Sequence, residues 1–196
     1  MIVLKSGLNG NVARVDDDNR LHTNSKSFFA EEVASQNGRA FIWHSECHLA
    51  AATSGGLLAF TSTDQTDITA ISRIYIDAHS LTDDIIVYQV KNPTLIGGTD
   101  IGANGIVNKN FTQGRTMAGN LVTSDGSADL TYTGGTNYHS FIISSKEKVI
   151  RDMRGTNILG NGDVILWGWA TLDGGNAVDG EKIALSVNTY LIPTEA

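Results

Sequence analysis

Residues 68–78 read ITAISRIYIDA, and this stretch carries the clearest alternation of side-chain types in the chain. Every second residue of the stretch is apolar or small, whereas the positions between them include Arg73 and Asp77. Neighbouring side chains of a β-strand point to opposite faces, so this period of two predicts a strand with one buried side. The following stretch, 84–91, is rich in β-branched residues. We expect it to pair with 68–78 as a hairpin whose ladder ends at Pro93, because proline cannot donate a hydrogen bond.

Other stretches with a strand pattern lie at 38–44, 138–145, 164–170 and 183–191. The run VILWGWA over 164–170 is apolar on both faces, as expected for a central strand that is covered on each side. Gly is abundant at 21 residues while Pro is scarce at 2, and Gly, Asn and Asp between the apolar runs favour tight turns. About eight to ten strands spaced by roughly 8–12 residues are typical of a sandwich or barrel. The sequence therefore predicts an all-β fold, an antiparallel β-sandwich.

Residues 1–26 are predicted to form an extended N-terminal arm or hairpin ahead of a β-sandwich domain over 27–196. Asn9 and Gly10 separate two short apolar stretches. Asn-Gly is the strongest short hairpin signal, because both central positions of a type I′ turn need positive φ. The arm carries little apolar mass, so we expect it to need another surface for its stability.

Two segments leave alternatives open. Residues 28–34 fit either a strand or two turns of helix closed by Gly38, and the β-like neighbours favour the strand. Residues 95–135 are polar and Gly-rich with only short apolar patches. So long an irregular segment is uncommon in a compact domain unless it is functional or braced by a neighbour. It is either a surface loop with a few short strands or a loop that becomes ordered against another subunit.

The overall charge and the cysteine content limit the classes of partner. Fourteen basic and twenty-one acidic side chains give a net charge of −7, whereas a nucleic-acid binder needs a basic face, so we expect no nucleic-acid partner. Cys47 is the only cysteine, which excludes an intrachain disulfide. The first residues lack a signal-peptide pattern, and no stretch approaches the roughly 20 apolar residues that span a bilayer. We therefore expect a soluble protein that is made in a cytoplasm and has no membrane partner.

Two short motifs could hold a metal ion. On a strand, His44, Glu46 and His48 would share one face, and these residue types are plausible zinc ligands. Their spacing does not match the Cys and His pairs of structural zinc sites, so a solvent-facing polar edge is the favoured interpretation. The acidic run over 16–18 lacks the alternate ligands and the closing Glu of an EF-hand, which favours a solvated turn. We expect no metal and no cofactor.

The sequence contains no catalytic motif of the common kinds. No serine lies in a Gly-x-Ser-x-Gly elbow, and neither a His-Glu-x-x-His pattern nor a phosphate-binding loop occurs. Exposed aromatic rings could bind sugars, and Trp43, Trp167 and Trp169 are the candidates. Trp167 and Trp169 lie in the most apolar run, however, which favours a place in the core. We expect a protein that is not an enzyme and assembles with other protein surfaces.

The layout of the chain resembles a family of tailed-bacteriophage virion structural proteins of the capsid-decoration or head-associated type. The resemblance covers most of the chain through short, degenerate pieces. They are GNVARV at 10–15 with NRLH at 19–22, NGRAF at 37–41, the Ile-rich strand at 71–76, NPT at 92–94, NKNF at 108–111 and GNGD at 160–163.

The resemblance implies a jelly-roll-like β-sandwich that decorates or cements the capsid of a phage particle assembled in the host cytoplasm. It carries over no catalytic residues. The partners would be the major capsid protein or other virion proteins, together with copies of the chain itself, for which we expect a trimer. The contacts are expected from the arm and from 95–135, with these candidate residues: Ile2, Leu4, Val12, Arg14, Val15, Arg20, Leu21, Asn108, Phe111 and Arg115.

Two other classes of function are weighed against this one. The first is a host-recognition or glycan-binding module associated with a tail or head fibre, which would use exposed side chains such as Trp43 and Tyr75. The second is a polysaccharide hydrolase, which needs two carboxylates about 5–10 Å apart in a cleft. The sequence shows no such pair, so the hydrolase ranks last.

Overall fold

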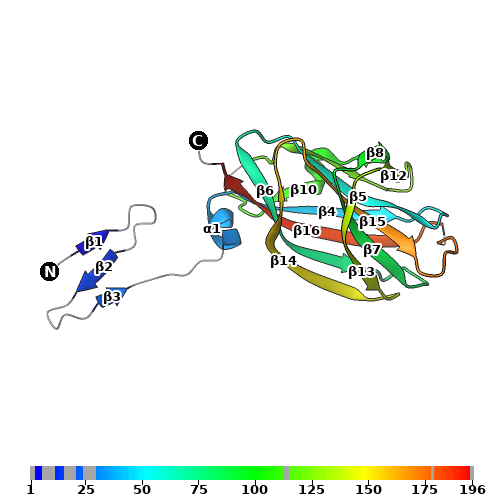
Figure 1. Cartoon of the computed structure of the whole chain (residues 1–196), viewed down its shortest axis with the longest axis horizontal. Coiled ribbons are helices and arrows are strands. Elements are labelled where there is room, and N and C mark those ends of the chain that lie inside the picture. Colours follow the sequence, from blue (N-terminus) through cyan, green and yellow to red (C-terminus); the bar gives the residue numbers. More distant parts are fainter. Residues whose placement is uncertain are drawn as a thin grey trace. The chain divides into compact units, whose positions relative to one another are not determined.

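The computed structural model describes residues 3–5, 12–15, 21–23, 30–112, 115–177 and 179–194. The chain divides into two units, 1–30 and 31–196. In the first unit β1 (Val3–Lys5), β2 (Val12–Val15) and β3 (Leu21–Thr23) form an antiparallel sheet in chain order (Figure 1). The predicted turns at Asn9 and Gly10 and at 16–18 lie outside the described residues.

The second unit is built on four nested strand pairs. The first strand, β4, pairs with the last, β16, and moving inward β5 pairs with β15, β6 with β14 and β7 with β13. A long hairpin whose pairs are nested in this way and rolled into two sheets is the eight-stranded jelly roll. The strands are β4 (Ala40–His48), β5 (Ser54–Ser62), β6 (Asp67–Asp77), β7 (Ile85–Lys91), β13 (Thr136–Ile143), β14 (Lys148–Leu159), β15 (Val164–Thr171) and β16 (Lys182–Pro193).

Two antiparallel sheets result, and they confirm the predicted sandwich. One has the order β10-β4-β16-β6-β14 and the other the order β13-β7-β15-β5-β11-β9. Their facing sides enclose the main core, which includes Trp43, Phe60 and Trp167. The predicted hairpin of 68–78 with 84–91 is wrong, because β6 and β7 belong to opposite sheets (Figure 1). Both hydrogen-bonding edges of β6 are already occupied, by β14 and by β16.

A bulge in β6 corrects the prediction of a single alternating face. Arg73 pairs with Asn188 and Ile71 pairs with Thr189, so Ser72 is left out of the ladder. An extra residue of this kind reverses the side on which the following residues lie. Ile71 therefore shares the main core with Ile74 although the two differ in parity.

The strand at 164–170 is central, as predicted. In β15, Ile165, Trp167 and Trp169 face the opposite sheet, whereas Leu166 joins a second buried cluster on the outer side. A two-stranded sheet of β8 (Thr94–Gly97) and β12 (Leu130–Thr133) supplies Leu130 to that second cluster. Both faces of β15 are thus covered, which explains its continuous apolar run.

The Gly-rich segment 95–135 contains short strands joined by loops, as the first of the two alternatives predicted. It adds β10 to the edge at β4 and β11 to the edge at β5, so it extends both sheets. At Gly119 a Cβ atom would lie 2.2 Å from the ring of Phe60, so the segment needs glycine to pack this closely. Its elements are β8, β9 (Thr99–Asp100), the 3-10 helix η1 (Gly102–Gly105), β10 (Ile106–Asn108), β11 (Gly119–Thr123) and β12.

The segment after the arm is a helix, not the strand that its neighbours favoured. The helix α1 (Ala30–Gln36) places Ala34 in a small cluster with Ala70 and Tyr190 on the outer side of a sheet. Gly38, at φ 67°, allows the backbone N–H of Arg39 to bond to the carbonyl of Ala34 at 2.7 Å and end the helix. The contact with the sheet decides the conformation, because seven residues are too few to be helical alone.

Candidate protein-contact surface

Phe111 is the most exposed large hydrophobic side chain among the described residues, with 91% of its surface open to solvent. It follows β10 in a turn of the Gly-rich segment 95–135. Burial of a phenylalanine side chain is worth about 1.5–3 kcal/mol. A ring held in water therefore marks a position where a partner could supply that burial.

The turn that carries Phe111 is braced by two asparagines. The side chain of Asn108 donates to the carbonyls of Gly38 at 2.8 Å and Arg115 at 2.9 Å, and its Oδ1 accepts from the backbone of Asn110 at 2.8 Å. The Oδ1 of Asn110 in turn accepts from the backbone and the hydroxyl of Thr112 at 3.0 and 2.7 Å. Such turns of side chain onto backbone fix the local conformation.

Two further contacts tie the turn to α1. Lys109 forms an ion pair with Glu31, and the side chain of Asn110 donates to the carbonyl of Gln36 at 3.0 Å. Partial burial by itself would raise the pKa of Glu31. The hydrogen bonds from Lys109 and Ser72 and the charges of Lys109 and Arg73 outweigh it and lower that pKa. Glu31 therefore stays ionised at neutral pH, and the bond to Lys109 persists.

Arg115, which follows the turn in the chain, is bonded to the jelly roll. Its guanidinium forms an ion pair with Asp67, whose side chain is only 4% exposed. Asp67 begins β6, so this pair anchors the Gly-rich segment to the jelly roll. Asn108 and Arg115, two of the predicted contact residues, thus also form bonds within the chain that position Phe111, and their contact with a partner stays a prediction.

The remaining predicted contact residues belong to the first unit. Leu4 lies in β1, Val12, Arg14 and Val15 lie in β2, and Leu21 begins β3. Ile2 and Arg20 lie outside the described residues.

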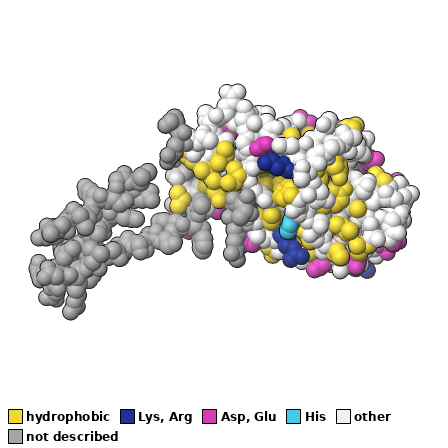
Figure 2. Space-filling view, viewed as in Figure 1, with side chains coloured by type: hydrophobic (Ala, Val, Ile, Leu, Met, Phe, Trp, Pro, Cys, Tyr) yellow, Lys and Arg dark blue, Asp and Glu magenta, His cyan; other side chains and the backbone are white. Residues whose placement is uncertain are grey.

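Sequence reasoning missed two exposed isoleucines on edge strands. Ile142 in β13 is 56% exposed and Ile150 in β14 is 60% exposed, and each of these strands ends the order of described strands in its sheet. The signal was available, because adjacent apolar pairs such as Ile142-Ile143 must place one side chain outside a two-layer fold. Figure 2 shows hydrophobic side chains spread over one face of the second unit with few charged side chains among them.

Sugar binding would need exposed aromatic rings, and the tryptophans considered for it are not exposed. Trp43, Trp167 and Trp169 are all buried, so the proposed role of Trp43 in an exposed glycan site is wrong. Trp43 lies on the side of β4 that faces the opposite sheet, and its ring stacks on that of Phe60 at 4.1 Å between ring centroids. Tyr75 lies half-buried on β6 and accepts a hydrogen bond from Arg73 at 3.3 Å.

Two of the three possible metal ligands on β4, His44 and Glu46, are bonded to other side chains. His44 shares a 2.7 Å hydrogen bond with Ser186, and Glu46 forms an ion pair with Lys182 at 3.1 Å. Among the described residues, no group of three or more His, Cys, Asp and Glu side chains is placed to hold a metal ion. Likewise, within the part of the chain that the structure describes, no helix is both long and apolar enough to cross a bilayer.

Cys47 is expected to resist thiol reagents in the folded protein. It is fully buried, and burial raises the pKa of its thiol to about 11, so almost no thiolate forms at neutral pH. Ellman's reagent should label the native protein slowly and the guanidinium-denatured protein completely. Rapid labelling of the native protein would contradict this placement.

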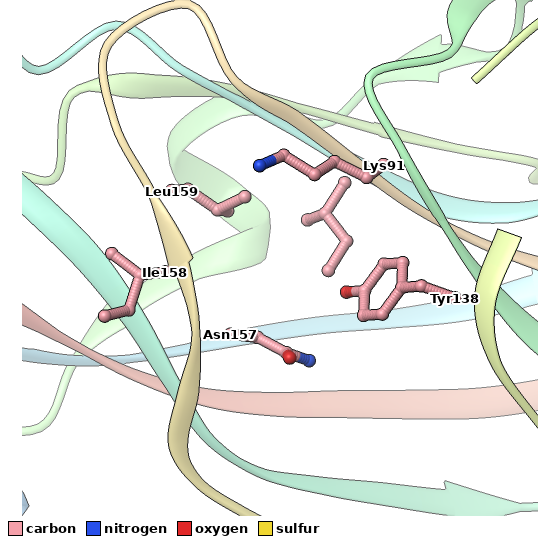
Figure 3. Close-up of a pocket in the computed structure, with 6 residues that line it drawn as sticks. Lys91, Tyr138, Asn157, Ile158 and Leu159 are labelled. Carbon is pink, nitrogen blue, oxygen red and sulfur yellow. The ribbon is translucent and has the colours of Figure 1, made fainter. Parts of the chain in front are cut away.

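A shallow groove of about 150 Å³ opens between the two sheets. Figure 3 shows Lys91, Tyr138 and Asn157, which come from β7, β13 and β14, around one space. Leu159 and Ile165 supply apolar surface. The polar members lie far apart in the sequence, so no motif could have revealed them.

The sequence matches no protein-family model, and the search of curated proteins finds no match. Among solved structures, the infectious bursal disease virus Gt strain is 14% identical over 95% of this chain and 46% of that chain, with a TM-score of 0.17. The VP2 subviral particle of the same virus is 15% identical over 95% and 48%, with a TM-score of 0.11. This chain therefore spans about half the length of those it matches, and scores this low carry no inference about function.

Proposed function

We propose that this protein is a non-enzymatic structural component of a bacteriophage virion that decorates or cements the capsid surface through protein contacts. The observation that carries the proposal is the braced turn that holds Phe111 in solvent. Aromatic anchors that enter a pocket of the partner dominate many protein interfaces. A conformation fixed before binding lowers the entropy lost on binding, so the hydrogen bonds of Asn108 and Asn110 would add to the affinity.

Two features of the architecture support assembly without selecting the partner. Jelly rolls occur in capsid proteins, lectins and cupins, so the fold by itself is an analogy. The described residues of the first unit form three short strands, and β1 and β3 each have one edge without a neighbour among those strands. Such an edge can add to a sheet of another chain. We further propose a homo-oligomer, a trimer, with Ile142 and Ile150 among its subunit contacts.

The proposal is tested by substitution of Phe111. Phe111→Ser should weaken binding to capsids that lack this protein by about tenfold or more, the effect of losing an interface anchor. Its thermal unfolding should not change, because the side chain touches little of its own chain. Co-sedimentation with purified capsids measures the binding, and calorimetry measures the unfolding.

Leu172→Ser provides the matched control, since Leu172 is half exposed directly after β15, outside the arm and outside 95–135. It should bind as the unchanged protein does. Equal binding by Phe111→Ser and Leu172→Ser would reject Phe111 as the anchor. The whole proposal fails if the protein does not bind capsids and particles formed without it are equally stable.

A host-recognition or glycan-binding module stays the second candidate. The sequence-based argument for this candidate used Trp43 as an exposed aromatic side chain, and the burial of Trp43 removes that argument. The groove beside Tyr138 replaces it, because a partly exposed aromatic ring next to an amine and an amide is a suitable surface for a small polar ring.

A further inference from the structure

The groove lined by Lys91, Tyr138 and Asn157 offers more hydrogen-bond donors than acceptors. Its polar lining consists of the amine of Lys91, the hydroxyl of Tyr138 and the amide of Asn157. Neither Lys91 nor the hydroxyl of Tyr138 has a hydrogen bond or ion pair with the described residues. Burial raises the pKa of Tyr138 to about 12, so its hydroxyl keeps its proton throughout the physiological range.

No carboxylate competes for these donors inside the groove. None of the described residues that line it is acidic. The nearby Asp163 is already bonded, to the backbone of Gly160 at 2.9 Å and to the side chain of Asn92 at 3.1 Å. Those hydrogen bonds, with a smaller contribution from the charge of Lys91, lower its pKa against the opposing effect of burial. Lys91 and Asp163 thus influence each other without forming an ion pair.

Two more donors lie one cross-strand row deeper. Lys91 is opposite Ile165 in the ladder of β7 and β15, and the next inward-facing row is Gln89 opposite Trp167. Both side chains of this row are fully buried, and within the described part of the chain neither Nε2 of Gln89 nor Nε1 of Trp167 has a hydrogen-bond partner. A buried donor without a partner costs about 1–3 kcal/mol.

Asn157 connects this deeper row to the groove. Its Nδ2 donates to Oε1 of Gln89 at 3.3 Å, whereas Nε2 of Gln89 has no hydrogen-bond partner among the described residues. The site therefore has a built polar wall behind its lining. The amine of Lys91, the hydroxyl of Tyr138 and the second N–H of Asn157 line the groove and outnumber its two side-chain acceptors, Oδ1 of Asn157 and the oxygen of Tyr138. The N–H groups of Gln89 and Trp167 are buried behind this lining.

From this excess of donors we infer that the groove binds the carboxylate of a small ring compound, of the size and class of a sugar acid. A carboxylate only accepts hydrogen bonds and carries the charge opposite to that of Lys91. A neutral sugar would bring donors of its own that find few acceptors. The volume of about 150 Å³ suits one six-membered ring, which would lie against Tyr138, Leu159 and Ile165.

The inference is independent of the capsid-binding proposal, because the groove and the Phe111 turn use different elements. Phe111→Ser should bind the acid unchanged, so failure of one proposal can be told from failure of the other.

Titrations monitored by NMR can test the inference on the full chain. Glucuronate should bind in the millimolar range or tighter and shift the indole N–H of Trp167, whereas glucose should bind at least about tenfold more weakly, as loss of a charge-assisted bond requires. Lys91→Met should weaken glucuronate binding by about tenfold. Lys182→Met removes an equal charge from β16 outside the groove and should have no effect.

The methyl glycoside of glucuronate distinguishes the source of the ligand. If it binds as well as the free acid, the ligand is a residue of a polysaccharide, and if it does not, the ligand is a free acid. Both outcomes support a carboxylate site. Equal binding of glucose and glucuronate, an unchanged affinity in Lys91→Met, or no binding of glucuronate at millimolar concentration would each overturn it.

Discussion

Trp43→Ala is expected to lower the free energy of unfolding by about 3–5 kcal/mol, the cost of truncating a buried tryptophan in a packed core. Trp43 stacks on Phe60 and meets Trp167 edge-on at 6.0 Å between ring centroids. Its Nε1 donates to the sulfur of Met117 at 3.1 Å. Alanine would remove these contacts and leave a cavity between the sheets. Since a domain is commonly stable by only about 5–15 kcal/mol, the loss would be a large share of the total.

Chemical denaturation of the full chain measures this effect, and two variants make it specific. Trp43→Phe keeps a ring against Phe60 and should cost less than half as much. Tyr75→Ala removes a half-buried ring from β6 and should cost clearly less than Trp43→Ala. A loss below about 1 kcal/mol for Trp43→Ala would contradict its central position. It would also restore Trp43 as a candidate for ligand binding.

The sequence predicts strands well where both faces of the strand leave a pattern. The run at 164–170 is apolar throughout, and β15 is covered on both sides. Trp167 lies in the main core on its inner side, and Leu166 lies in the second cluster on its outer side. What the pattern cannot state is which strand pairs with which. The nearest strand along the chain is the usual choice, but in a jelly roll the pairs are nested. The partners of 68–78 therefore lie at 148–159 and 182–193.

Two local errors have identifiable physical causes. The bulge at Ser72 reverses the alternation inside a strand, and a strict period of two cannot represent it. The helix α1 exists because Ala34 packs on the sheet, and the first-turn acids Glu31 and Glu32 with Gly38 were its only local signals. The strand pattern of the adjacent segments outweighed those helix signals in the prediction, which therefore favoured a strand.

The candidate site was predictable only in part. The resemblance to virion proteins pointed to Phe111, and the structure shows it exposed on a braced turn. The resemblance could not show that Asn108 and Arg115 stabilise that turn through bonds within the chain. Asn108 bonds to Gly38 and Arg115 to Asp67, and these partners are distant in sequence. The groove of Lys91 and Tyr138 had no sequence signal, since nested pairing alone brings its strands together.

Arg115→Met is expected to lower the free energy of unfolding by about 2–4 kcal/mol, because it leaves the buried carboxylate of Asp67 without its partner. An uncompensated buried charge costs much more than the ion pair contributes, and the partial exposure of Arg115 places the estimate below the highest such values. Lys148→Met is the matched control. Its pair with Asp77 is largely exposed, so the loss should stay below about 1 kcal/mol.

A double-mutant cycle separates this structural role from a direct contact. Asp67→Asn in the Arg115→Met background removes the lone charge, so the double variant should be more stable than the sum of the two single losses by about 1–3 kcal/mol. Weaker capsid binding by Arg115→Met would then follow from a loosened turn. The loss of binding in Arg115→Met should exceed that in Lys148→Met only to the extent that Arg115→Met is less stable. If Arg115→Met left the unfolding unchanged and still reduced capsid binding, Arg115 would touch the partner directly, as its position in the sequence first indicated.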